Sequence, residues 1–253
     1  MLLKTINKVI SPLGLNLKKT VNSVLDEPRF FDLSKEDRKL INQVRPYTMT
    51  SEERMIQLIR GVQYIISNKI EGDFVECGVW KGGSSMLIAL TLQNMNVNDR
   101  KIWMYDTYEG MSDPTVEDKH FDGSDAQKLL NETNRLEDQI WCYSTFEEVE
   151  ENIKSTKYPF HLIQMIKGKV EDTIPENLPL KISLLRLDTD FYESTKHELN
   201  HLYPILSKFG VLFIDDYGHW QGARQATDEF INDLGHPLFL SRVDYTARLT
   251  IKY

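Results

Sequence analysis

The chain has 253 residues, of which 41% are hydrophobic and 27% charged, a composition typical of a globular protein with a substantial core. Its formal net charge of −8 argues against a nucleic-acid partner, because such binding depends on clustered lysine and arginine. No stretch approaches the ~20 apolar residues of a transmembrane helix, and no signal peptide is predicted. Two cysteines, Cys77 and Cys142, cannot form a disulfide framework. We therefore expect a cytoplasmic protein whose two thiols are reduced and buried.

The first 44 residues are predicted to be a helical N-terminal extension, and residues 45–253 a single domain. Lysines alternate with aliphatic residues over residues 1–20, which is typical of an amphipathic segment. This pattern favours a helix that packs on the protein or forms an oligomer contact over a helix that lies on a membrane surface. We expect a homo-oligomer, since most soluble assemblies are symmetric.

From residue 51 onward, helical and strand-like patterns alternate along the chain. A helix at 51–66 precedes a strand at 74–77, a helix at 84–93 and a strand at 102–105. The turn-rich residues 107–127 predict a long excursion over a site. A helix at 146–153, strands at 161–166 and 182–187, a helix at 195–208, a strand at 211–214 and a helix at 224–234 follow, with antiparallel strands within 238–251. This order predicts an α/β fold with a doubly wound, mainly parallel sheet and an antiparallel edge.

Acidic residues follow four of the predicted strands, at the end of the sheet where ligands bind in such folds. They are Glu76, Asp106, Asp188 with Asp190, and Asp215 with Asp216. The first strand also leads into a glycine-rich turn, residues 78–85, where a ligand can approach the backbone and the next helix offers free amides. The turn matches neither the dinucleotide fingerprint nor a P-loop. Because Asp106 is placed to hold ribose hydroxyls, the pattern predicts an adenosine-bearing ligand without a diphosphate.

The acids after the fourth and fifth strands predict a metal site. Asp188, Asp190, Asp215 and Asp216 would repel one another if they converged without compensating arginine or lysine. A hard cation relieves this repulsion, and oxygen ligands suit Mg²⁺, Mn²⁺ or Ca²⁺. The alternative is that these carboxylates cap helices or lie in solvated turns.

Residues 197–201 match H-E-x-x-H, the motif of zinc proteases. A capping box formed by Thr195 and Glu198 explains the glutamate without catalysis. Pro204 also follows shortly after the second histidine, where a catalytic helix would continue. We therefore do not expect a zinc site at this motif.

Four segments together resemble one enzyme family. Residues 45–50, 72–84, 187–195 and 215–224 resemble the macrocin O-methyltransferase family, which includes the mycinamicin and novobiocin deoxysugar methyltransferases. The resemblance runs from about residue 45 to residue 230. It implies a class I, Rossmann-like methyltransferase fold, S-adenosylmethionine as methyl donor, Mg²⁺ or else Mn²⁺, and a sugar hydroxyl as acceptor, in natural-product or glycan biosynthesis. The excursion at 107–127 has the place of the family's acceptor-covering insertion.

The resemblance also assigns residues to functions. The metal ligands would be Asp188, Asp215 and Asp216, and the general base Asp190. The cofactor would contact Thr48, Met49, Glu76, Gly78, Trp80, Gly82, Gly83, Ser84, Asp106, Ser144, Gly168 and Glu171. Two alternatives stay open: a methyltransferase for catechol-like phenols, and a non-catalytic protein that binds a nucleotide or carbohydrate on this fold.

Overall fold

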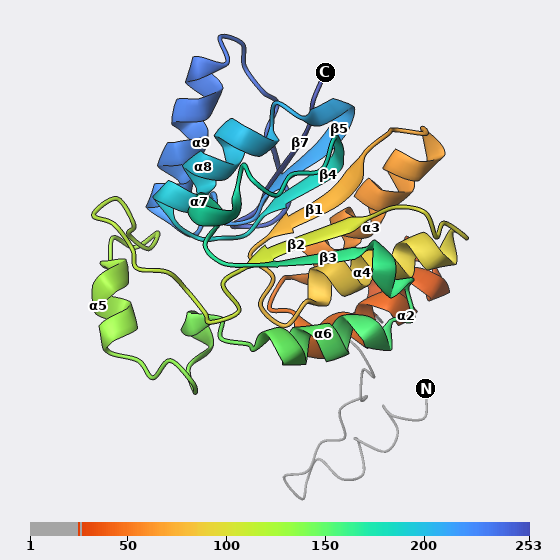
Figure 1. Cartoon of the computed structure of the whole chain (residues 1–253), viewed down its shortest axis with the longest axis horizontal. Coiled ribbons are helices and arrows are strands. Elements are labelled where there is room, and N and C mark those ends of the chain that lie inside the picture. The colour runs from red at the N-terminus through yellow and green to blue at the C-terminus, as the bar shows by residue number, and fades with distance from the viewer. Residues whose placement is uncertain (1–24, 26) are drawn as a thin grey trace, which may run out of the picture.

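The computed structural model describes residue 25 and residues 27–253, which fold around one seven-stranded sheet with the order β3-β2-β1-β4-β5-β7-β6 (Figure 1). The strands are β1 (Asp73–Cys77), β2 (Ile102–Asp106), β3 (Ile163–Lys167), β4 (Ile182–Leu187), β5 (Leu206–Ile214), β6 (Ser241–Arg242) and β7 (Arg248–Ile251). Neighbouring strands from β3 to β5 are parallel, whereas β7 pairs antiparallel with both β5 and β6. The predicted doubly wound sheet with an antiparallel edge is therefore confirmed.

Helices cover both faces of this sheet (Figure 1). The α-helices are α2 (Lys35–Val44), α3 (Glu52–Ser67), α4 (Gly83–Asn94), α5 (Ala126–Asn131), α6 (Phe146–Ser155), α7 (Val170–Thr173), α8 (Tyr192–Leu202) and α9 (Gln221–Asp233). Short 3₁₀ turns are η3 (Pro28–Phe30), η4 (Arg45–Tyr47), η5 (Gln139–Trp141) and η6 (Phe160–Leu162). One layer contains α2, α3, α4 and α6, and the other α7, α8 and α9.

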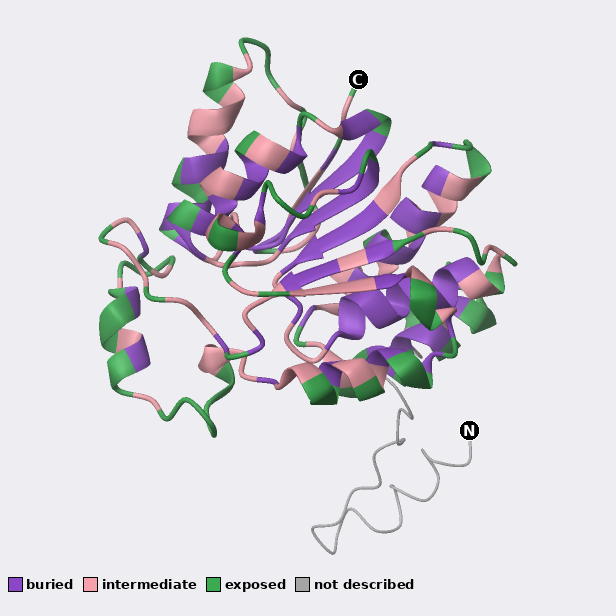
Figure 2. Ribbon diagram, viewed as in Figure 1, coloured by how far each residue is buried: buried purple, intermediate pink, exposed green. Residues whose placement is uncertain are grey.

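Alternation along the strands builds the two hydrophobic cores, because successive side chains point to opposite faces of a sheet. In β1, Phe74 packs with α3 and α4, whereas the next residue, Val75, packs with α8. The central strands β1 and β4 are buried almost throughout, while α5 lies at the periphery and is largely exposed (Figure 2). The carboxyl ends of the buried parallel strands are thus held rigidly, and the site is built there.

Two local predictions for the segment around α8 are wrong. The helix predicted at 195–208 begins earlier and ends at Leu202, and β5 then starts at Leu206. A short apolar run such as Ile205 and Leu206 fits either period, and here pairing of Leu206 with Ile182 of β4 decides in favour of a strand. Thr195 lies inside the helix rather than at its N-cap, which is Phe191, so the predicted capping box does not exist.

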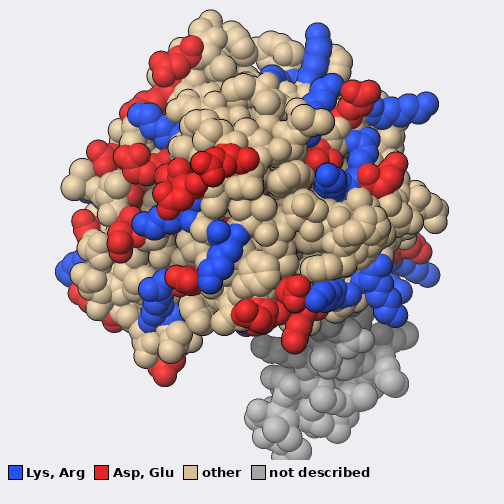
Figure 3. Space-filling model, viewed as in Figure 1, with Lys and Arg blue, Asp and Glu red and all other residues tan. Residues whose placement is uncertain are grey.

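The N-terminal region is only partly described. The amphipathic segment at residues 1–20 lies outside the described residues. Leu25, Phe30 and α2 share the hydrophobic core of α3 and α4, and the division at residue 44 stays a prediction. Among the described residues, no helix has the length and apolarity to cross a bilayer. Cys77 is buried as expected, but Cys142 is partly exposed. On the face shown in Figure 3, acidic and basic side chains are interspersed.

Candidate active site

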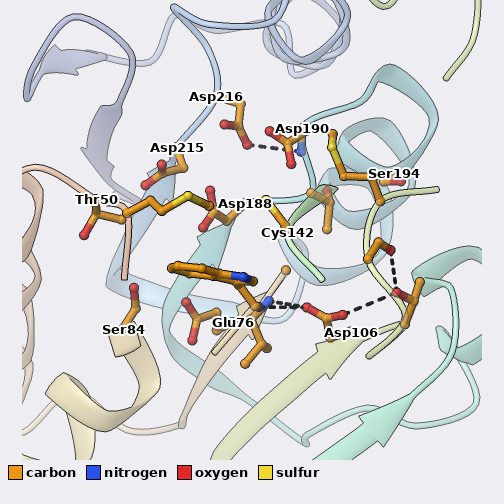
Figure 4. A pocket seen from close by; sticks show the side chains of 18 of the residues that line it. Thr50, Glu76, Ser84, Asp106, Cys142, Asp188, Asp190, Ser194, Asp215 and Asp216 are labelled. Atoms are coloured by element: carbon orange, nitrogen blue, oxygen red, sulfur yellow. Dashed lines mark hydrogen bonds between the residues drawn. The ribbon is translucent and has the colours of Figure 1, made fainter. Parts of the chain in front are cut away.

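A cavity of about 460 Å³ lies at the carboxyl ends of the parallel strands. All six acidic residues predicted at the strand ends line its wall. They are Glu76 from β1, Asp106 from β2, Asp188 and Asp190 after β4, and Asp215 and Asp216 after β5. Figure 4 shows that the four aspartates after β4 and β5 lie together on one side, with Glu76 and Asp106 on the other. The cavity therefore has two halves.

In the first half, Asp106 holds the glycine-rich turn in place. One of its oxygens, Oδ2, accepts hydrogen bonds from the backbone N–H groups of Val79 (2.6 Å) and Trp80 (3.0 Å). The other, Oδ1, accepts the backbone N–H of Tyr108 (2.7 Å). Burial raises the pKa of Asp106, although these three hydrogen bonds oppose the shift. The carboxylate therefore fixes the conformation of the turn as well as facing the cavity.

Two glycines allow close approaches that shape this half. At Gly78 the backbone has φ +79°, and a Cβ atom would lie 1.9 Å from the carbonyl oxygen of Asp188. At Gly83 a Cβ would lie 2.4 Å from the carbonyl oxygen of Tyr47 and 2.7 Å from Cβ of Thr48. The second contact brings the segment with Thr48 and Met49 against the start of α4. Both glycines are therefore required by packing, in addition to any contact with a ligand.

The second half contains the predicted metal ligands. Asp188, Asp215 and Asp216 each offer a carboxylate oxygen, and these atoms all lie within 4.8 Å of one another. Burial raises the pKa of Asp188 and of Asp216 well above the ordinary range, and neighbouring aspartates add to the shift.

Arg186, near the carboxyl end of β4, joins the two halves of the cavity. Its Nη1 donates to Glu76 Oε1 (2.7 Å) and to Asp188 Oδ2 (2.6 Å), and its Nη2 donates to Asp215 Oδ1 (2.7 Å). The side chain is 3% exposed. A second arginine, Arg54 of α3, bonds Asp215 Oδ2 through Nη1. Burial opposes ionisation of Asp215, but the two arginines outweigh it and lower its pKa below the ordinary value.

These arginines correct one premise of the metal prediction, namely that the acids converge without basic partners. The sequence contains a signal for Arg186, since it is a charged residue within the apolar run of β4, next to Leu185 and Leu187. Arg54 lies on a helix distant in sequence from Asp215, so neither spacing nor periodicity could have placed it there. A cluster with both acids and arginines still offers oxygen ligands to a cation.

Asp190 has an unusual backbone conformation, with φ 67°, in the left-handed region that non-glycine residues seldom occupy. Its backbone N–H donates to Asp216 Oδ2 (3.1 Å), and its Oδ1 accepts the indole N–H of Trp220 (2.7 Å). Burial, reinforced by the charge of Asp188, raises the pKa of Asp190 to about 8. The side chain is thus held in one orientation at the edge of the acidic cluster.

Aromatic rings form the rim beside these acids. His120 and Phe121, from the excursion before α5, pack against His219 after β5, and Tyr245 between β6 and β7 contacts both Phe121 and His219. Phe121 is 58% exposed and Tyr245 54%. These residues come from three separate segments of the chain, which is why sequence patterns did not group them. The rings of His219 and Tyr245 line the cavity with the aspartates, and neighbouring rings of the group meet at steep angles rather than in one plane.

The excursion is fixed to the body of the protein at Asp118. Its Oδ1 accepts the backbone N–H of Tyr192 at the start of α8 (2.7 Å), and its Oδ2 accepts that of Thr115 (2.7 Å). A Cβ at Gly222 of α9 would lie 2.0 Å from Asp118 Oδ1. His120 also forms an antiparallel bridge with Trp220.

Most residues assigned from the sequence line this cavity. The exceptions are Gly82 and Ser144. Gly82 is the N-cap of α4, with φ +86°, and Ser144 is buried with its hydroxyl on Glu148 (2.8 Å). Glu171 and Gly168 lie in the wall, and Glu171 accepts the hydroxyl of Ser194 (2.8 Å).

The histidines of the H-E-x-x-H motif do not form a site with the glutamate. His197 Nε2 lies 3.0 Å from the carbonyl oxygen of Ile174, and His201 Nδ1 lies 2.8 Å from that of His197. Glu198 is fully buried on the other side, where its Oε2 accepts the hydroxyl of Thr189 (3.1 Å) and Oε1 has no hydrogen-bond partner. The motif is therefore a coincidence of spacing, and the glutamate supports the loop that contains Asp188 and Asp190.

Comparison with known proteins agrees with this arrangement. The model of the macrocin O-methyltransferase (TylF) family matches residues 11–250. The chain belongs to the macrocin O-methyltransferase family. It is therefore an S-adenosylmethionine-dependent O-methyltransferase, and the non-catalytic alternative is set aside.

Individual members of the macrocin O-methyltransferase family show the same relationship. The chain is 31% identical over 184 residues to demethyldecarbamoylnovobiocin O-methyltransferase of Streptomyces niveus, covering 73% of this chain and 67% of that protein. It is 30% identical over 201 residues to 8-demethyl-8-(2,3-dimethoxy-alpha-L-rhamnosyl)-tetracenomycin-C 4'-O-methyltransferase of Streptomyces olivaceus, covering 79% and 74%. Among solved structures, the O-methyltransferase NovP superposes with a TM-score of 0.72 at 26% identity, covering 99% of this chain and 98% of that one.

Proposed function

We propose that this enzyme transfers the methyl group of S-adenosylmethionine to a sugar hydroxyl and that a divalent cation, Mg²⁺ or Mn²⁺, assists the reaction. One observation carries the proposal: a single cavity contains both a glycine-rich turn held by Asp106 and a convergent set of aspartates. The name of one relative describes 4'-O-methylation of a compound that carries a dimethoxyrhamnosyl group, and this supports a sugar acceptor.

The donor set fits a hard divalent cation. Asp188, Asp215 and Asp216 supply only carboxylate oxygens, which are the ligands that Mg²⁺ and Mn²⁺ prefer. A bound cation would supply positive charge beside the acceptor hydroxyl and lower its pKa, a shift that a carboxylate alone cannot produce. The buried position of Asp215 and Asp216 strengthens this electrostatic effect, because water is excluded from one side of the cluster.

Asp190 is the residue placed to accept the proton of the hydroxyl. Its carboxylate lines the cavity, and the hydrogen bond from Trp220 fixes its orientation. The methyl group leaves a sulfonium as the oxygen attacks it in line, so a base on the acceptor side completes the transfer. The two buried halves hold donor and acceptor in a fixed geometry, which is the main requirement of such a displacement.

The aromatic rim supports a sugar as the acceptor. His219 and Tyr245 line the cavity with the aspartates, and Phe121 packs edge-on against both rings. The C–H faces of a sugar pack well on such rings. The vicinal hydroxyls of the same sugar would then point toward the acidic cluster. A catechol-like phenol remains the alternative acceptor, and acceptor profiling separates the two classes.

Calorimetric titration of S-adenosylhomocysteine and of Mg²⁺ into the full chain tests the proposal. We expect micromolar nucleotide binding that Asp106→Ala abolishes and cation binding that Asp215→Ala abolishes, whereas Asp113→Ala, on the exposed part of the excursion, changes neither. Asp190→Asn should bind both ligands normally and lose turnover by at least roughly 100-fold, the contribution of a general base. Folded protein that binds no S-adenosylhomocysteine would contradict the proposal, and full turnover by Asp190→Asn would exclude Asp190 as the base.

A further inference from the structure

Arg54 contacts two acids with different positions relative to the cavity. Its Nη1 bonds Asp215 Oδ2, within the cluster of predicted cation ligands. Its Nε forms an ion pair with Oδ2 of Asp244 at 2.9 Å, although the Nε–H is not aligned for a hydrogen bond. Asp244 belongs to the turn between β6 and β7 and is not one of those ligands. The guanidinium therefore spans from the acidic cluster to a carboxylate outside it.

The two arginines at the cluster are held very differently. Arg186 bonds three acids at once, two of them buried, so its position is fixed. Arg54 contacts the cluster only at Asp215, its side chain is 15% exposed, and it lines the cavity. With Arg186 on Oδ1 and Arg54 on Oδ2, both oxygens of Asp215 are engaged. A cation that takes Asp215 as a ligand must therefore compete with Arg54, the less constrained of the two.

Asp244 is built to retain Arg54 after such an exchange. Its Oδ1 accepts the backbone N–H groups of Thr246 (2.9 Å) and Ala247 (2.8 Å), and its Oδ2 accepts the hydroxyl of Ser51 (2.6 Å). Ser51 is also the N-cap of α3, the helix that carries Arg54. The second partner of Arg54 is thus rigid and attached to the same helix end, and it does not depend on Asp215.

We propose that Arg54 is an exchangeable internal counter-ion of the acidic cluster. It neutralises Asp215 when no divalent cation is bound, and it releases Asp215 while it stays paired with Asp244 when a cation binds. The aspartates can then pack together in the cation-free enzyme, and the cation affinity is set by competition with a side chain. This inference rests on the metal-dependent part of the proposed function.

Mn²⁺ binding to the full chain, measured from the electron paramagnetic resonance signal of the free ion, tests the exchange. Arg54→Gln should tighten Mn²⁺ binding at least about fivefold, the lower end of usual coupling between sites. Asp244→Asn should weaken it, because Arg54 then keeps Asp215 as its single acidic partner. In the double variant Asp244→Asn should have little further effect, since no guanidinium remains to compete. Arg60→Gln, which removes an ion-paired arginine of the same helix, is the matched control and should change nothing.

The double-mutant cycle separates exchange from simple electrostatics. If the negative charge of Asp244 acted only at a distance, its loss would weaken Mn²⁺ binding equally in the wild type and in Arg54→Gln. Additive effects, or unchanged or weaker binding by Arg54→Gln, would overturn the inference while leaving the metal site intact. If neither the wild type nor Arg54→Gln binds Mn²⁺, the metal-dependent part of the proposed function fails as well. As an independent check of folding, saturating Mn²⁺ should raise the Tm of Arg54→Gln more than that of the wild type, because a ligand that binds the folded state more tightly stabilises it more.

Discussion

Replacing Arg186 by methionine should destabilise the enzyme strongly, even though methionine fills a similar volume. Arg186 is 3% exposed and makes charge-assisted hydrogen bonds of 2.6–2.7 Å to Glu76, Asp188 and Asp215. The variant leaves Glu76 and Asp188 without this buried cation, while Asp215 keeps Arg54. Removing one partner of a buried ion pair costs about 3–5 kcal/mol, because the remaining charge stays buried and unpaired.

The expected change in thermal unfolding follows from the size of the chain. For a protein of about this length, each kcal/mol shifts Tm by roughly 2–4 °C, so Arg186→Met should lower Tm by about 6–20 °C. The loss should also depend on pH. Burial favours the neutral form of the orphaned carboxylates, so their folded-state pKa values rise above the unfolded ones and the penalty grows as pH increases. The variant should therefore be closer to the wild type at pH 5 than at pH 8.

Circular dichroism melts and urea titrations of both proteins at pH 5 and pH 8 measure these effects. Arg224→Met is the control, because Arg224 is 64% exposed and its ion pair with Asp228 spans 3.5 Å. Its loss should cost less than about 1 kcal/mol. If Arg186→Met lost no more stability than Arg224→Met, or lost the same amount at both pH values, the view of Arg186 as the essential buried cation of the cluster would be refuted.

Three further changes test other parts of the site. Burial raises the pKa of Glu198 well above its ordinary value, and Glu171 and Asp216 add to the shift, against a hydrogen bond from Thr189. The free energy of unfolding should therefore fall as pH rises above the unfolded pKa of Glu198, by up to about 1.4 kcal/mol per pH unit while the folded group stays neutral. Glu198→Gln should flatten the dependence of Tm on pH between pH 5 and 8. Parallel pH profiles of the wild type and the variant would contradict this prediction. Gly83→Ala forces Tyr47 and Thr48 away from α4 and should weaken S-adenosylhomocysteine binding about 5- to 150-fold by calorimetry, equivalent to an overpacking cost of about 1–3 kcal/mol. Unchanged binding would contradict the packing role of Gly83. Asp106→Asn keeps the shape of the side chain but turns an amide N–H toward the backbone donors of Val79 and Trp80, so its affinity for the same ligand should fall at least about tenfold, and unchanged affinity would contradict the role of Asp106 in holding the turn.

The sequence correctly predicted those features that depend on a single local pattern, such as an apolar run or a glycine-rich turn. Apolar runs fixed the five parallel strands, and the rule that ligands bind at the carboxyl ends of such strands brought Glu76, Asp106 and the aspartates after β4 and β5 to one cavity. The glycine-rich turn could be placed because it directly follows β1. These inferences need only local sequence and the topology of a parallel sheet.

What the sequence did not reveal depends on contacts between distant segments. Arg54 reaches Asp215 across 161 positions of the chain, and no period or motif connects them. The rim formed by Phe121, His219 and Tyr245 requires knowledge of how the excursion folds back. The predicted boundary between α8 and β5 was wrong because a short apolar segment fits both the helical and the strand period, and pairing with β4 determines that it is a strand. The cytoplasmic location and the homo-oligomer stay predictions.

The attachment of the excursion at Asp118 has a consequence for the redesign of acceptor range. The segment that carries Phe121 and α5 contacts the body of the enzyme through Asp118, which needs the open space above Gly222 and the free amide of Tyr192, and through the bridge of His120 with Trp220 beside it. A loop transplanted from another family member would therefore seat correctly only if it brings an aspartate at this position to a recipient with glycine at position 222. Grafts that obey this pairing can vary the exposed rim, whereas grafts that break it lose the anchor at Asp118 and depend on the bridge of His120 with Trp220 and on the packing of α5.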